Sequence, residues 1–158
     1  MSDDIIWLDF ETEAIEDGAP LLPKPVGVAL LGGPYPEGKY LAFGHPSGNN
    51  CTWGEARDVL ASIWGKRLGT QNGCTFDIPV AGHHFGLPDR DPMLTEDTLF
   101  LIYLHDPHAR SLSLKDIAAD WLGIPPDEQQ DMYDWIMANV PECRSRKQCG
   151  AYISKAPA

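Results

Sequence analysis

Short apolar runs separated by turn residues occupy the N-terminal part of the chain. The runs at 5–11, 26–31 and 39–43 are rich in Ile, Val, Leu and aromatic residues, which is typical of buried strands. Gly and Pro residues separate the runs and mark the turns. Because the runs are closely spaced, the pattern predicts three strands in an antiparallel meander.

The rest of the chain is dominated by helical spacing. Thr52, with Glu55 three residues later, predicts a capping box at the start of a helix whose apolar positions continue to Trp64. A short fourth strand is expected within 66–71. Caps and apolar spacing predict further helices at 75–86, 98–105, 113–122 and 127–140. Three strands, a helix, a strand and then helices predict an α/β fold, in which helices flank a mixed sheet.

For two of these helices the sequence also predicts the cap or the buried side chains. Either Thr95 or Asp97 would cap the helix at 98–105. The helix at 127–140 is expected to turn three side chains inward, namely Met132, Trp135 and Ile136.

The composition is that of one folded domain. The chain has 158 residues, 43% of them hydrophobic, which is enough for a sizeable core. No apolar run approaches the ~20 residues of a membrane-spanning helix, and the N-terminus is acidic, unlike a secretory signal. We therefore expect a cytoplasmic protein with no membrane partner. The four cysteines lack zinc-site spacing, so we expect reduced thiols.

The strongly negative net charge disfavours direct binding of nucleic acid by this chain. The formal net charge is −11, whereas a free-standing nucleic-acid binder is usually basic. Residues 1–23 hold seven acids and no base, while 141–158 hold four bases and one acid. Tight binding by this chain alone is therefore not expected, but metal ions or a partner could bring the substrate to an acidic site.

Asp9 and Glu11 lie two residues apart on the first predicted strand, so both side chains leave the same face. A buried pair of like charges is costly unless a cation compensates it, and carboxylate oxygens suit Mg²⁺ or Mn²⁺. Alternatively, both residues are ordinary surface acids at a strand end. Taken alone, the spacing favours this second interpretation.

Asp77 favours the metal-site interpretation of Asp9 and Glu11 over that of ordinary surface acids. It follows a polar turn and Phe76 where a short strand passes into a helix. The helix dipole alone can explain an acid in this position. If the short strand lies beside the first one, however, Asp77 comes close to Asp9 and Glu11. Three convergent carboxylates are typical of a metal site.

These segments resemble motifs of the DnaQ-like (DEDD superfamily) 3′–5′ exonucleases. Residues 7–12 are similar to the first motif and 72–77 to the second, while 97–100 and 112–118 are similar to later segments. The resemblance is closest to the proofreading domains of phage-type and bacterial family A DNA polymerases. It covers most of 5–140 and implies a ribonuclease H-like fold.

The resemblance also implies a site and a substrate. Asp9, Glu11 and Asp77 would be catalytic, metal-binding carboxylates that hold two Mg²⁺ or Mn²⁺ ions about 4 Å apart. Thr12 would contact the 3′ end of a single-stranded DNA, and Asn72 and Phe76 match positions near the terminal nucleotide. Phe76 is equally expected as a core aromatic. A DNA polymerase domain or subunit is the implied partner.

The chain departs from the family at the third motif, which is Tyr-x-x-x-Asp in one branch and His-x-x-x-x-Asp in the other. No Tyr is followed by Asp at that spacing, and His84, which precedes Asp89 correctly, comes too early. We expect an exonuclease domain at 1–140 and a basic segment at 141–158, non-helical from 150 onward and cut short before the last motif. The expected activity is weak. A degenerate module that binds nucleic acid or a polymerase partner is the alternative.

Overall fold

A five-stranded mixed sheet forms the centre of the computed structural model, which describes residues 5–14, 22–124 and 130–158. Its strands are β1 (Ile6–Thr12), β2 (Pro25–Gly32), β3 (Tyr35–Ala42), β4 (Leu68–Thr70) and β5 (Thr95–Asp97). The order across the sheet is β3-β2-β1-β4-β5. The first three strands are antiparallel, and β1, β4 and β5 are parallel. The predicted meander and α/β class are confirmed, and the sheet is compatible with a ribonuclease H-like fold.

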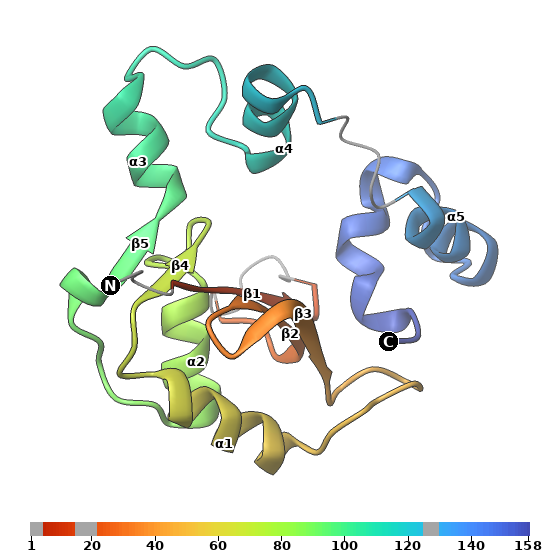
Figure 1. The fold of residues 1–158 in the computed structure, drawn as a ribbon. Helices are drawn as coiled ribbons and strands as arrows, with labels where there is room; N and C mark the ends of the chain where they lie inside the picture. The colour runs from red at the N-terminus through yellow and green to blue at the C-terminus, as the bar shows by residue number, and fades with distance from the viewer. Residues whose placement is uncertain (1–4, 15–21, 125–129) are drawn as a thin grey trace.

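Helices flank this sheet (Figure 1). They are α1 (Trp53–Ile63), α2 (Asp77–Phe85), η1 (Pro92–Leu94), α3 (Thr98–His105), α4 (Leu114–Ile117), η2 (Ala118–Leu122), α5 (Gln130–Asn139) and η3 (Arg146–Lys155). The predicted capping box of α1 is present, with Thr52 Oγ1 accepting from Glu55 N and Glu55 Oε2 accepting from Thr52 N. Asp97, and not Thr95, caps α3.

Three details of the prediction were wrong. The helix α2 begins at Asp77 and not at residue 75, because 72–76 form a turn. Trp135 does not face inward but is 37% exposed, because Ile136 and Val140 form the buried side of α5. The chain from 150 onward is helical, since the 3₁₀ helix η3 continues to Lys155. The expected start of the last helix at 127 lies outside the described residues.

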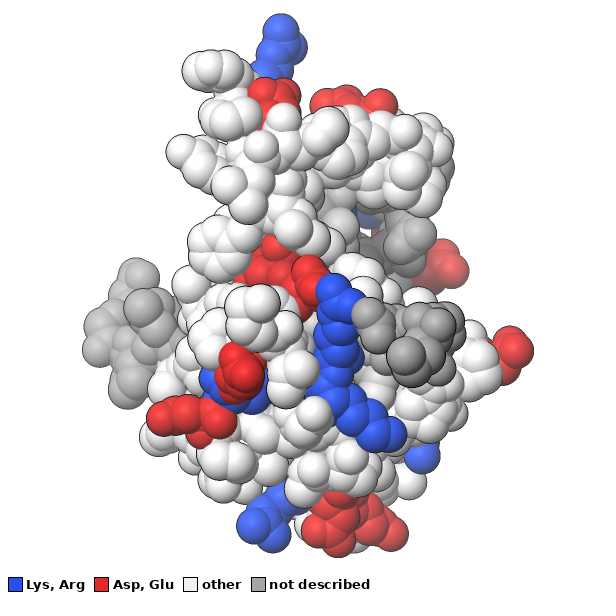
Figure 2. Space-filling model, turned by 60° about the vertical axis from the view of Figure 1, so that its left-hand side comes forward, with Lys and Arg blue, Asp and Glu red and all other residues white. Residues whose placement is uncertain are grey.

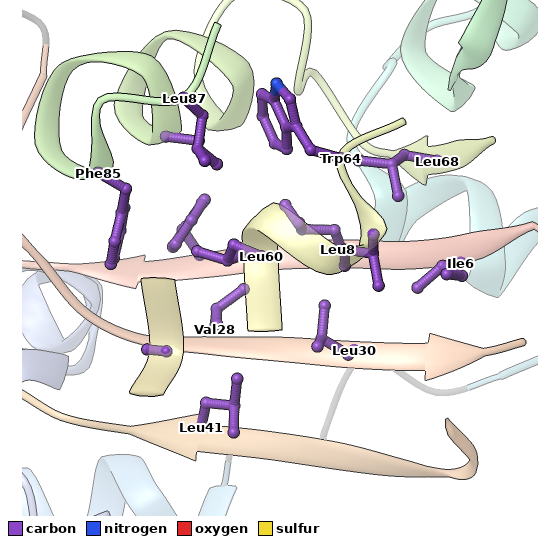
Figure 3. Close-up of a cluster of buried hydrophobic side chains, with 14 of the residues drawn as sticks. Ile6, Leu8, Val28, Leu30, Leu41, Leu60, Trp64, Leu68, Phe85 and Leu87 are labelled. Atoms are coloured by element: carbon purple, nitrogen blue, oxygen red, sulfur yellow. The ribbon is translucent and has the colours of Figure 1, made fainter. Parts of the chain in front are cut away.

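The main core lies on one face of the sheet. Ile6, Leu8 and Phe10 alternate along β1 and are buried, and side chains of α1 and α2 pack against the same face (Figure 3). Because strand residues alternate between faces, the residues between them leave the opposite face. The core therefore fixes the direction of Trp7, Asp9 and Glu11.

A second apolar cluster joins α5 to η3. It contains Ile136, Val140, Cys143, Cys149 and Ala156. All four cysteines carry free thiols, and the Sγ atoms of Cys143 and Cys149 are 3.5 Å apart. His45 Nδ1 lies 2.9 Å from the carbonyl oxygen of Ala156, which ties the C-terminal helix to the loop after β3. Within the described parts of the chain, no helix combines the length and apolar character needed to cross a bilayer.

Candidate functional site

Asp9 and Glu11 lie on the sheet face that the main core leaves uncovered. Their neighbours across the antiparallel pair are small, since Asp9 is opposite Ala29 and Glu11 is opposite Gly27. A break in the β1–β2 register follows between Glu11 and Thr12. The two carboxylates therefore stand near the end of β1, with little side-chain bulk beside them on β2.

Asp77 reaches β1 through a hydrogen bond to the main chain. Its Oδ1 accepts from the backbone N–H of Phe10 at 2.8 Å, and Asp77 is only 1% exposed. The register explains this bond, because β4 is three residues long and pairs only with Ile6 and Trp7. Beyond Trp7 the edge of β1 that faces β4 pairs with no strand among the described residues, and Asp77 takes that place at Phe10. The bond brings Asp77 beside the residue between Asp9 and Glu11.

The turn that presents Asp77 is held by Asp97. The two carboxylate oxygens of Asp97 accept from the backbone N–H groups of Asn72 at 2.9 Å, Cys74 at 3.0 Å and Leu99 at 3.1 Å. Since β4 and β5 are parallel neighbours, Thr70 pairs with Asp97 at the end of both strands. Asp97 therefore serves as a cap for both the turn and α3.

The pKa values of all three predicted carboxyl groups are raised. Burial raises the pKa of Glu11 to about 7, with the charge of Asp9 adding to the shift and that of Lys115 opposing it. Burial also raises the pKa of Asp77 to about 7; the Phe10 N–H opposes the shift, and the charges of Asp9 and Asp97 add to it. The pKa of Asp9 is raised by burial of its carboxyl group, although the residue as a whole is exposed. The structure thus gathers acids whose charges disfavour one another.

The ligand atoms of this cluster suit a divalent metal ion but, among the described residues, their arrangement does not form a three-ligand metal site. Buried carboxylate oxygens with raised pKa values are hard ligands that a divalent cation would stabilise. Across residues 5–14, 22–124 and 130–158, however, no three His, Cys, Asp or Glu side chains are arranged so that they could hold one ion. The predicted metal site therefore stays a prediction, with Asp9, Glu11 and Asp77 as its candidate ligands.

Thr12 ends β1, Asn72 and Phe76 belong to the turn before Asp77, and all three have protein partners. Thr12 Oγ1 donates to the carbonyl of Glu13 at 3.0 Å. Asn72 has a positive φ of 61° in the turn, and its Oδ1 accepts from Thr75 Oγ1 at 2.6 Å. Phe76 is half-buried and packs against the main core. The substrate roles of these residues stay predictions.

A cavity of about 650 Å³ opens beside Asp9 on the same sheet face. Trp7, Leu31 and Tyr40 line it from β1, β2 and β3, and Leu114 of α4 lines it from across the gap. The sequence interpretation gave Trp7 no role beyond its strand and motif. The signal was nevertheless present, because Trp7 lies two residues before Asp9 and so shares its face.

Charge is unevenly distributed around this region. Figure 2 shows acidic atoms gathered in the hollow below the upper part of the molecule. The helix α3 contains no Asp, Glu, Lys or Arg, and four of its apolar or aromatic side chains are exposed, namely Phe100, Leu101, Tyr103 and Leu104. Thr98 of α3 lines the cavity together with Asp9, so this uncharged helix lies next to the candidate site.

Comparison of the sequence with the models of known protein families gives no match, and comparison with curated proteins gives none either. Neither comparison assigns a family. The geometry of the site and the motif resemblance are therefore what indicate a function.

Proposed function

We propose that this protein is a metal-dependent 3′–5′ exonuclease that removes nucleotides from single-stranded DNA ends. In this proposal it acts in the cytoplasm as the proofreading part of a DNA polymerase. The observation that carries the proposal is the hydrogen bond from Phe10 N to Asp77 Oδ1, which brings Asp77 to the main chain between Asp9 and Glu11. The motif order along the chain supports the same reading.

Each residue has a distinct part in the proposed reaction. Asp9 and Glu11, side by side on one strand face, would hold the cation, and Asp77 would offer it the oxygen that does not accept from Phe10. Bound Mg²⁺ or Mn²⁺ would activate a water molecule and stabilise the leaving oxygen. Thr12 would position the 3′ end, while Asn72 and Phe76 shape the turn beside it.

A second candidate function follows from the missing fourth carboxylate. Asp97 is the other buried acid near Asp77, but three backbone N–H groups already occupy its oxygens. A catalytically degenerate module, which binds nucleic acid or a polymerase partner without cutting, is consistent with this occupancy.

Hydrolysis of a labelled single strand during a Mn²⁺ titration separates the two functions. The exonuclease proposal predicts nucleotides released one at a time from the 3′ end, and Asp9→Ala is expected to reduce the rate to background. Asp58→Asn is the matched control, because Asp58 is an exposed acid of α1, which covers the opposite face of the sheet. No metal-dependent cleavage by the wild-type protein, or equal cleavage by Asp9→Ala, would contradict the exonuclease.

A further inference from the structure

The cavity beside Asp9 has the size and lining of a small-molecule site. Its volume of about 650 Å³ falls within the range of such pockets, which are mostly apolar with a few polar groups. Its floor is the sheet face that carries Asp9, and Leu114 and Thr98 bound it on the other side. The cavity is therefore continuous with the proposed reaction site.

Trp7 forms a flat platform on the floor of this cavity. Its indole lies directly over Gly69 of β4, since a Cβ at Gly69 would come within 2.5–2.7 Å of three ring atoms. The absence of a side chain at Gly69 lets the ring lie against the sheet. Trp7 is still 39% exposed, so part of its surface is open to a ligand. Tyr40 lies in the same way over Gly27.

The polar residues of the wall are fixed in place. Thr98 Oγ1 lies within hydrogen-bonding distance of two acceptors, Thr70 O and Gln71 Oε1, and Gln71 Nε2 donates to the carbonyl of Leu112 at 2.9 Å. These bonds satisfy the hydroxyl proton of Thr98 and a donor of Gln71. The wall is thus preorganised, and shape and stacking would dominate recognition over hydrogen bonding to a ligand.

Charge and spacing favour one kind of occupant. Trp7 and Asp9 are two residues apart on β1, a separation of about 6.6 Å along the strand. A nucleotide spans a comparable distance from its base to its phosphate. Lys115 of α4 provides positive charge near Glu11, opposite in sign to a phosphate. A nucleotide with its base in the cavity would therefore leave its phosphate near the carboxylates and Lys115.

We propose that the cavity binds the base of the 3′-terminal nucleotide, stacked on Trp7, with the phosphodiester directed toward Asp9 and Glu11. This inference rests on the proposed function. Stacking on an aromatic ring is tolerant of sequence because every base has a π-face, so all four bases are accepted. Trp7 is then a substrate-binding residue that sets the depth at which the terminal nucleotide sits.

Binding of dAMP tests the inference without any bond being cut. Titration calorimetry in the presence of Mg²⁺ is expected to show saturable binding by the wild-type protein. Base–aromatic stacking contributes about 1–3 kcal/mol, so Trp7→Ala should weaken binding by about 5- to 150-fold. Trp7→Phe should retain most of the affinity because it keeps an aromatic ring.

Two further variants separate stacking from a loss of folding. Trp135→Ala removes a similarly exposed tryptophan from α5, outside the cavity, and should bind dAMP as the wild type does. Leu114→Trp adds bulk at the opposite wall and should block binding while the circular dichroism spectrum stays native. Deoxyribose 5-phosphate, which lacks the base, should bind much more weakly than dAMP.

The outcomes distinguish this inference from the proposed function. If strands are cut in an Asp9-dependent way but Trp7→Ala binds dAMP as tightly as the wild type, the inference fails and the exonuclease stands. If dAMP binding depends on Trp7 but no strand is cut, the cavity is a nucleotide site and the exonuclease fails. No saturable dAMP binding by the wild type, or equal binding of deoxyribose 5-phosphate, overturns the inference.

Discussion

At the scale of single residues, the bond between Phe10 and Asp77 is the contact on which the candidate site depends. It gives the buried N–H of Phe10 an acceptor at a point where β1 extends beyond its pairing with β4. The sequence showed that Asp9 and Glu11 share a face, because that follows from strand alternation. It could not show which N–H group Asp77 would meet, because this depends on the parallel register of two distant segments.

Replacing Asp77 should therefore affect stability as well as any activity. Asp77→Ala leaves the buried Phe10 N–H without an acceptor, at a cost of about 1–3 kcal/mol. Asp77→Asn keeps an oxygen at that position and should lose much less. Urea denaturation measures both free energies of unfolding. Equal stabilities for the two variants would show that the bond contributes nothing.

The pKa of Glu11 predicts how stability depends on pH. Its value rises from an ordinary 4.5 to about 7 in the folded protein, so the folded state binds the proton more tightly. The resulting stabilisation is complete below about pH 4.5 and is lost as the pH rises to about 7. Glu11→Gln removes this titration and should flatten the fall in melting temperature over that interval.

The slope should not vanish entirely in Glu11→Gln, because the pKa of Asp77 is also raised to about 7 and adds to it. Melting temperatures of both proteins from pH 4 to 8, without divalent metal, make the comparison. An unchanged slope in the variant would be inconsistent with the raised pKa of Glu11.

At the scale of elements, the sequence predicted the helices and strands that depend on neighbouring residues, but not those that depend on tertiary packing. The capping box of α1 and the apolar strands β1 and β2 each follow from a few neighbouring residues. The strand β5 was not predicted, since Thr95–Asp97 is short and polar and exists through its pairing with β4. The helical form of η3 was missed because it depends on packing of Cys149 and on the His45 bond to Ala156.

The capping box offers a prediction at this scale that is independent of function. Thr52→Ala removes the acceptor of Glu55 N and the hydroxyl partner of its carboxylate. A lost N-cap typically costs about 1 kcal/mol, and the same loss is expected here by chemical denaturation. Thr52→Ser keeps the hydroxyl and should be near wild type. A Ser variant as unstable as the Ala variant would contradict the capping role.

At the scale of the whole molecule, the strongly acidic chain carries its carboxylate cluster beside an apolar cavity and an uncharged helix. The cavity could not be predicted from the sequence, because Trp7, Leu31 and Leu114 come from three separate elements. A net charge of −11 opposes a DNA strand, so the proposed function needs cations at Asp9 and Glu11. The proposed function therefore depends on metal binding.

Calorimetric titration of Mn²⁺ into the wild-type protein and into the Asp9→Asn/Glu11→Gln double variant tests this most directly. The proposed function predicts saturable binding by the wild type and a loss of at least about tenfold in affinity, or about 1.4 kcal/mol, in the double variant. Asp58→Asn should bind as the wild type does. Failure of the wild type to bind Mn²⁺, or unaltered binding by the double variant, would contradict a metal site at Asp9 and Glu11.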